Sequence, residues 1–315
     1  MKKNYIITAH KNPQQLARLV HSLNDHNAAF YIHINADVDI APFEAVLSFP
    51  YVFFIQDRVK CIWGNFGLVQ ATINVMTFIA ETNTEGWCIW LSGQDYPVKN
   101  AEQREAVLAQ NEGFNFIDLN PVEYVLPTQW KKRLLYYRFT PSQKQYDYFL
   151  LPGIFTIHFL KHFPQNLAKI FLLLSKGITL NTIFSKIKHK RTHPVNIAPY
   201  GGSTWWALNF ATLKKVVSFI RANTAFVQYH QDTSIPDELF FQTIINHLCQ
   251  TDPSIKIKPS LTFVNWNLTN AGSSPAVFTA ENYSEIMQLP ETKIFARKFD
   301  AEVDSAILDL IDRSV

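Results

Sequence analysis

The chain has 315 residues, of which 47% are hydrophobic and 17% are charged, and its 29 basic and 26 acidic side chains give a net charge of +3. This composition supports a large buried core, which excludes a protein that is disordered, collagen-like or of low complexity. A charge so close to balance gives no reason on its own to expect a nucleic-acid partner.

The first 120 residues alternate strand and helix signals. Short runs rich in Tyr, Ile, Val and Phe predict strands, and apolar residues three or four positions apart predict helices. Strands alternating with helices are typical of an α/β fold, with a mostly parallel central sheet and helices on both faces. The predicted strands are 5–8, 30–34, 51–55, 87–91 and 114–117, and the predicted helices are 13–23 and 69–79.

Polar segments follow three of these strands, at 10–11, 35–37 and 92–97. Open α/β sheets bind ligands beyond the carboxyl ends of their strands, so these segments are candidates for a binding site. The third is the densest, because Gly93 permits a close backbone approach, Asp95 offers a carboxylate and a proline stiffens the loop. A functional loop is favoured there over a plain turn.

Two patterns could be taken for metal sites. Asp37-Val38-Asp39 is a D-x-D, by which many sugar-nucleotide transferases hold a divalent cation, although a solvated turn is the default interpretation. His10 and His33 lie at strand ends without partners at ligand spacing, which favours a core or hydrogen-bonding role. No metal is therefore expected.

Asp237 and Glu238 follow Pro236, a residue that suits the first turn of a helix. Either both acids only interact favourably with the helix dipole, or one of them points into a site as a general base. The local pattern leaves both alternatives open. The common nucleotide-binding motifs and the G-x-S-x-G hydrolase motif do not occur in the sequence.

The charges are unevenly placed along the chain. No acidic residue lies between Asp147 and Asp232, a stretch that holds ten of the basic residues, so 19 bases face 26 acids elsewhere. Within it, 154–191 is a basic amphipathic segment, which predicts either contact with an anionic membrane or ordinary helices with solvated lysines. Nucleic-acid binding is not expected, because no recognition motif accompanies the charge.

The three cysteines suggest a reducing compartment, because they form neither a disulfide framework nor a C-x-x-C motif. The apolar run after Lys2 and Lys3 is too short for a signal peptide, and no run reaches the roughly 18 residues of a spanning helix. We therefore expect a cytoplasmic protein, peripheral at the inner membrane face if the basic segment contacts lipid.

Seven segments follow one another along nearly the whole chain, at 9–13, 31–34, 59–64, 91–99, 201–208, 236–238 and 295–300. Together they resemble the core-2/I-branching β-1,6-N-acetylglucosaminyltransferases (glycosyltransferase family 14), which include the peptide O-xylosyltransferases. Ser-Gly-Gln-Asp-Tyr-Pro and Phe-Ala-Arg-Lys-Phe-Asp are the most specific segments. The resemblance implies a single GT-A-like domain over 1–315, with a UDP-sugar-binding half at 1–120 and an acceptor and catalytic half at 121–315.

The resemblance also implies an inverting, metal-independent transfer of N-acetylglucosamine from UDP-GlcNAc to a glycan hydroxyl, without a cofactor. The family's catalytic glutamate matches Glu238, and inversion needs one such carboxylate to take the acceptor proton. The family's diphosphate-binding lysine matches Lys298, and Arg297 supplies a second cation. The other implied contacts are Thr8, His10, Asn35 and Asp95 to the donor, and Glu123, Trp130, Trp205 and Trp206 to the acceptor, with one of the last two rings facing it.

The sequence departs from the family pattern at three positions. Asn35 stands where members often have an aspartate near the uridine, and Ser273 aligns near a second diphosphate-binding arginine of animal members, for which Arg297 is the candidate replacement. Asn65 stands where a second glycine is more usual after Trp63-Gly64. The animal enzymes also carry disulfides and a membrane anchor, so we expect this chain to be a bacterial relative.

The expected setting is the synthesis of a surface polysaccharide or lipid-linked glycan. Two rival functions stay open. One is transfer from UDP-xylose or another UDP-sugar, and the other is a non-catalytic protein that binds glycans or docks on a membrane.

Overall fold

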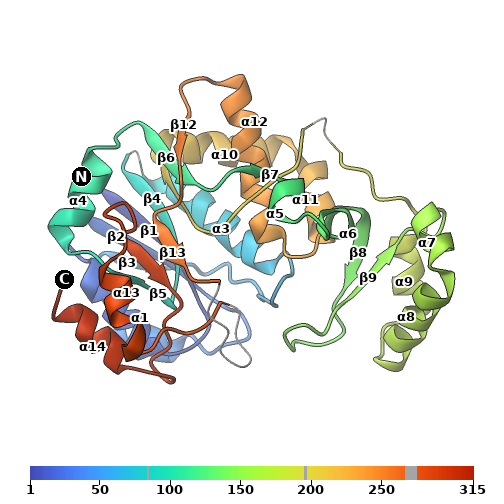
Figure 1. Cartoon of the computed structure of the whole chain (residues 1–315), viewed down its shortest axis with the longest axis horizontal. Coiled ribbons are helices and arrows are strands. Elements are labelled where there is room, and N and C mark those ends of the chain that lie inside the picture. The colour runs from blue at the N-terminus through green and yellow to red at the C-terminus, as the bar shows by residue number, and fades with distance from the viewer. Residues whose placement is uncertain (84, 195–196, 267–274) are drawn as a thin grey trace.

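The structure is a computed structural model that describes residues 1–83, 85–194, 197–266 and 275–315. At its centre lies a seven-stranded sheet in which four of the six strand pairings are parallel (Figure 1). The expected α/β fold, GT-A-like with a mostly parallel sheet, is thereby confirmed, and β11 alone runs antiparallel to its neighbours. In spatial order the strands are β12 (Lys256–Lys258), β6 (Phe114–Ile117), β11 (Trp206–Asn209), β4 (Trp87–Ser92), β1 (Lys3–Ala9), β2 (Ala28–Ile34) and β3 (Val52–Phe54).

Helices cover both faces of this sheet because its strands are apolar on both sides. Along β1, Tyr5 and Ile7 enter one core cluster while Ile6 enters the other, as the alternation of a strand requires. The first cluster includes side chains of α1 (Pro13–Leu23), α2 (Ala41–Val46) and α14 (Ala306–Asp312). The second includes side chains of α3 (Gly67–Thr82), α10 (Phe210–Ala222), α11 (Thr224–Gln231) and α12 (Phe240–Thr251). Two further helices are α4 (Ala101–Ala109) and α13 (Tyr283–Met287), and η2 (Ala280–Asn282) is a short 3-10 helix.

A three-stranded sheet brings distant parts of the chain to the end of β4. Its strands are β13 (Thr262–Val264), β14 (Phe295–Arg297) and β5 (Asp95–Pro97), and Arg297 is in register with Asp95. The central sheet likewise takes β11 and β12 from beyond residue 120. The two halves that the sequence suggests on either side of residue 120 therefore share their sheets.

An extension stands apart from the main body, at the right of Figure 1 in yellow-green. A hairpin-like ribbon of β8 (Tyr136–Phe139) and β9 (Phe149–Pro152) carries α7 (Ile157–Lys161), α8 (Phe163–Ser175) and α9 (Leu180–Ile187). These elements have an apolar cluster of their own. The helix α6 (Trp130–Leu135) packs against both strands of the ribbon. The short strands β7 (Asn120–Pro121) and β10 (Tyr200–Gly201) pair with each other, and α5 (Val122–Val125) packs against both.

The root of the extension is fixed by Arg191, which is only 4% exposed. Its guanidinium donates to the carbonyl oxygens of Tyr136 at 2.6 Å, Tyr229 at 2.7 Å and Asp232 at 3.2 Å. Several hydrogen bonds to one buried guanidinium hold the ribbon against the main body.

Across the ranges that the structure describes, no helix combines the length and apolarity needed to cross a membrane.

His33 is a buried histidine at the last position but one of β2. Its Nε2 accepts a hydrogen bond of 2.8 Å from the backbone N–H of Val59, and burial lowers its pKa from the ordinary 6.5 to about 4. The folded protein thus resists protonation of His33 that the unfolded chain accepts. The contribution of His33 to stability is therefore complete above about pH 6.5 and is lost as the pH drops from there toward 4.

We expect His33 to account for a loss of about 3 kcal/mol in the free energy of unfolding over this pH range. Urea denaturation at several pH values will measure it. His33→Gln keeps an acceptor for the Val59 N–H but has no proton to gain, so its stability should depend less on pH than that of the wild type. Parallel pH curves for the two proteins would contradict this account.

Candidate active site

Glu238 lies in a short turn that the rest of the protein holds in place. The turn is the 3-10 helix η1 (Pro236–Glu238), preceded by Ile235 in the left-handed region at φ 52°. That backbone conformation costs a β-branched residue on the order of 1–2 kcal/mol, so surrounding contacts must impose it. The Ile235 N–H donates to the Gly64 carbonyl at 2.8 Å, and the Gly202 N–H donates to the Glu238 carbonyl at 3.1 Å.

The Gly202 position also explains why the Gly-Gly pair precedes Ser203. A Cβ at Gly202 would lie 2.0 Å from the carbonyl oxygen of Asp118, which no side chain tolerates. Gly202 therefore allows the chain to pass between the end of β6 and the turn that carries Glu238.

The Glu238 carboxylate pairs with Arg133 of α6, with 2.5 Å between Oε2 and Nη1. The Glu238 side chain is 23% exposed to solvent, and the Arg133 side chain is 10% exposed. Burial raises the pKa of Glu238, an effect that Arg133 opposes and the neighbouring Asp237 reinforces. A partly exposed carboxylate with a raised pKa, oriented by a guanidinium, has the properties of a general base.

Asp237 has a different environment from Glu238. Its Oδ2 accepts a hydrogen bond of 2.9 Å from the Thr204 hydroxyl, and burial raises its pKa. Trp205, the residue after Thr204, stacks under the Arg297 guanidinium, whose Cζ lies 4.7 Å from the ring centroid. Thr204 and Trp205 therefore connect the turn of Glu238 directly to Arg297.

Arg297 is bound to the loop after β4. Its Nη1 donates to Ser92 Oγ at 2.5 Å and to Asp95 Oδ1 at 3.1 Å, while the Ser92 N–H donates to the other Asp95 oxygen. The Asp95 side chain is fully buried. Burial raises the pKa of Asp95, and Arg297 and the hydrogen bonds from Ser92 oppose that shift. Asp95 thus orients Arg297 and has no exposed atom with which to contact a ligand in this conformation.

Positive charge gathers next to Arg297. Desolvation lowers the pKa of His10, and Lys11, Lys298 and Arg297 lower it further. Burial likewise lowers the pKa of Lys298, with Arg297 acting in the same direction. Lys11 is neutralised by Asp300 at 2.5 Å, whereas in the described ranges no side-chain hydrogen bond or ion pair is found for Lys298. Among the described residues, Lys298 is therefore a cation that an anionic ligand could meet.

Two predicted donor contacts are engaged in local structure. Asn35 Nδ2 donates to the Cys61 carbonyl at 3.2 Å, and its Oδ1 accepts from the Cys61 N–H at 3.1 Å. Asn35 thereby fixes the loop that leads to Trp63. Thr8 is 7% exposed on β1, between His33 and Ser92 on the neighbouring strands.

The D-x-D pair does not converge on one point. Asp37 forms an ion pair of 2.8 Å with Lys60, whereas Asp39 Oδ1 accepts a hydrogen bond of 3.1 Å from the Ala41 N–H at the start of α2. Within the described ranges, no three His, Cys, Asp or Glu side chains come together as a metal site would require. These carboxylates serve local structure.

The predicted acceptor residues are more scattered than expected. Trp205 and Trp206 are 6% and 2% exposed, and Trp206 packs against Trp90 and Phe241. In this structure neither ring is open to a sugar, which corrects the expectation that one of them faces the acceptor. The Trp205 ring is instead the surface on which the Arg297 guanidinium stacks. Glu123 is exposed on α5 and Trp130 is half-buried on α6, while Ser273 lies outside the described residues.

Arg133 and Arg138 are two residues of the site to which the sequence patterns assign no such role. Arg138 Nη1 donates to Ser234 Oγ at 2.7 Å and Nη2 to the Trp63 carbonyl at 2.9 Å. Its Nε donates to Asn65 Oδ1 at 2.6 Å. Asn65, a departure from the family pattern, thus binds the arginine that links the Trp63 loop to the turn of Glu238. Neither arginine lies in the seven segments that carry the family resemblance.

Comparison with known proteins places these features in context. The profile described as "Branch: Core-2/I-Branching enzyme" matches residues 4–288. Xylosyltransferase 2 of Homo sapiens is 23% identical over an alignment of 329 positions, which covers 98% of this chain and 33% of that protein. Xylosyltransferase 1 of Rattus norvegicus is 22% identical over an alignment of 332 positions, which covers 98% of this chain and 35% of that protein. The chain therefore spans about a third of the length of these relatives.

Proposed function

The chain belongs to the Core-2/I-branching enzyme family, and from this we propose that it transfers a sugar from a UDP-sugar donor to a hydroxyl of a glycan. One observation carries the proposal. Glu238 is a partly buried carboxylate oriented by Arg133. The neighbouring Asp237 accepts a hydrogen bond from Thr204, and Trp205, the residue after Thr204, stacks on Arg297, which precedes Lys298 in the chain. An inverting transfer needs these two elements side by side: a base for the acceptor and positive charge for the leaving group.

In the proposed reaction the acceptor hydroxyl attacks the anomeric carbon while Glu238 takes its proton. The bond between that carbon and the diphosphate oxygen breaks, and its electron pair leaves with UDP. The Lys298 ammonium and the Arg297 guanidinium stabilise the negative charge that develops on the diphosphate. Since fixed cations can do this without a divalent ion, we propose that the reaction is independent of metal and needs no cofactor.

Arg133 has a second role in this proposal. Its ion pair holds the Glu238 carboxylate in one orientation and favours its ionised form. Within the described residues the ion pair engages Oε2, and we propose that the other carboxylate oxygen takes the proton of the acceptor hydroxyl.

We propose UDP-GlcNAc as the donor and a β-1,6 linkage as the product, because the seven matching segments resemble the acetylglucosaminyltransferases. UDP-xylose is the second candidate, and the names of the relatives above favour it. The acceptor that we propose is a surface polysaccharide or a lipid-linked glycan, reached from the cytoplasmic side of a membrane. A non-catalytic glycan-binding protein is the remaining alternative.

Release of UDP from a panel of UDP-sugars will test this proposal. We expect one donor, UDP-GlcNAc, to be turned over at least about ten-fold faster than UDP-xylose, UDP-glucose and UDP-galactose when a glycan acceptor is supplied. Activity should be the same in EDTA and in manganese. Preference for UDP-xylose would select the second candidate, and activity that EDTA removes and manganese restores would overturn the metal-free mechanism. Binding of glycan without UDP release from any donor would favour the non-catalytic alternative.

A further inference from the structure

Apolar side chains are concentrated on the outside of the extension. In the described part of the chain, nine of the 15 large apolar side chains that are exposed lie between residues 155 and 184. Exposed apolar residues are normal when scattered, but a concentration of them marks an interaction surface. We call these nine the apolar surface: Phe155, Ile157, Leu160, Phe163, Leu167, Phe171, Leu172, Leu180 and Phe184.

None of these nine residues belongs to the apolar cluster of the extension itself. On α8, Phe163, Leu167 and Phe171 are four residues apart and so form one outward stripe. The extension's own cluster is filled from the adjacent face of the same helix, by Ile170 and Leu173. A helix that is apolar on two sides, and buried on only one of them, has an unoccupied contact face.

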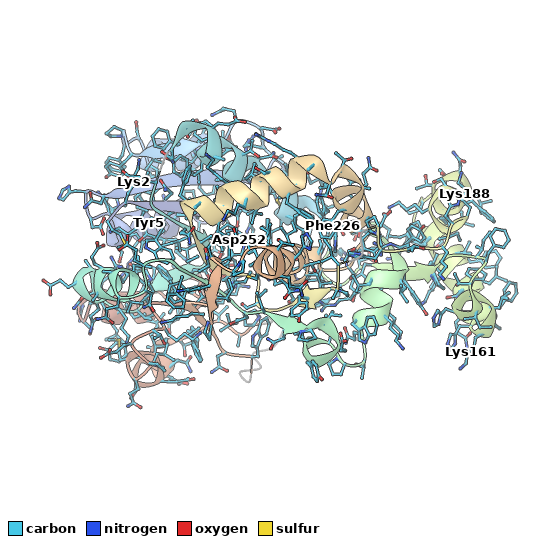
Figure 2. All side chains as sticks on the ribbon, turned by 90° about the horizontal axis from the view of Figure 1, so that it is seen from above. Lys2, Tyr5, Lys161, Lys188, Phe226 and Asp252 are labelled. Atoms are coloured by element: carbon cyan, nitrogen blue, oxygen red, sulfur yellow. The ribbon has the colours of Figure 1, made fainter. Side chains whose placement is uncertain are left out.

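Unpaired positive charge lies on the same extension. Lys161, Lys188 and Lys190 are exposed, and no ion pair is found for them within the described residues, whereas Lys176 and Lys186 pair with Asp147 and Asp232. Figure 2 shows Lys161 and Lys188 at the outer end of the extension, far from the main body. No acidic residue lies between 148 and 231 to neutralise them.

We propose that the extension docks on an anionic lipid bilayer, with the apolar surface inserted among the headgroups and the lysines bound to phosphate. Apolar side chains flanked by lysines suit this interface, because the ammonium groups meet lipid charge while the rings leave water. A symmetric contact with a second copy is disfavoured, since it would bring two such positive extensions together. The proposal is independent of the reaction proposed above and does not require catalytic activity.

Co-sedimentation of the full chain with vesicles tests this proposal. We expect binding to vesicles of phosphatidylcholine mixed with phosphatidylglycerol to be at least about ten-fold tighter than to phosphatidylcholine alone, and to weaken with salt. The double variant Phe155→Ser/Phe171→Ser should lose on the order of ten-fold in affinity for the mixed vesicles. The triple variant Lys161→Glu/Lys188→Glu/Lys190→Glu should lose the preference for anionic lipid.

Matched controls lie on the main body. Val303→Ser removes an apolar side chain that is 61% exposed, and Lys214→Glu reverses an exposed charge on α10; neither should change vesicle binding. Far-ultraviolet circular dichroism will verify that all variants are folded. Failure of the wild type to bind mixed vesicles, or equal binding by the double variant, overturns the proposal. The proposal is also overturned if light scattering shows that the wild type is a dimer and the double variant a monomer, and neither protein binds vesicles.

Discussion

Replacement of Glu238 by Gln is expected to lower kcat for sugar transfer by about 10²- to 10⁴-fold, the range that a general base contributes. The Gln side chain has the same size and can still accept a hydrogen bond from Arg133, so the turn at η1 should be preserved. It cannot take a proton from the acceptor. Steady-state kinetics will measure the loss, and calorimetric titration should show that UDP binds within about two-fold of the wild type.

The control for this variant is Glu291→Gln, which removes the same charge from an exposed position in the turn after α13. It should leave kcat unchanged. Turnover by Glu238→Gln at the wild-type rate would remove Glu238 from the role of base. A loss of UDP binding together with activity would instead indicate that the substitution disturbs the site as a whole.

The second large effect is expected at Arg297, whose removal should affect both stability and donor binding. Arg297→Met leaves the fully buried Asp95 carboxylate without its cation. An uncompensated buried charge of this kind costs about 3 kcal/mol of the free energy of unfolding. Urea denaturation will measure that loss. The affinity for UDP should fall by at least about ten-fold, because the proposed mechanism gives Arg297 a share in stabilising the diphosphate charge.

Two companion variants separate these effects. Lys298→Ala should lower UDP affinity to a similar degree but change stability by less than about 0.5 kcal/mol, since the described structure shows no side-chain partner for Lys298. In the double variant Asp95→Asn/Arg297→Met, part of the lost stability should return because the buried charge is removed as well. Equal stability of Arg297→Met and the wild type would show that Asp95 does not depend on the pair.

The fold was predictable from the sequence where its signals are local. The runs at 5–8 and 87–91 are apolar enough to identify β1 and β4 without any knowledge of their neighbours. The antiparallel direction of β11 could not be predicted, because the direction of a strand depends on the path of the chain between strands. The three-residue strands β5 and β14 were also missed, since their pairing depends on contacts about 200 residues apart.

The candidate site, like the fold, was predictable only where its residues lie in recognisable segments of the sequence. Glu238 and Lys298 were identified through segments whose order along the chain resembles a family. The pairing of Glu238 with Arg133 could not be foreseen, because it joins residues 105 positions apart. The pattern at Trp205 and Trp206 was misleading for another reason: both rings pack against Trp90 in one core cluster, and Arg297 stacks on Trp205.

The attachment of the extension has a consequence for orientation. β8 begins directly after α6, the helix that carries Arg133, and the buried Arg191 ties this junction to the carbonyls of Tyr136 and Tyr229. An extension held by these hydrogen bonds keeps a fixed orientation relative to the main body. A surface that binds the extension therefore also sets the orientation of Glu238 relative to that surface, and with it the distance from the surface at which an acceptor can be reached.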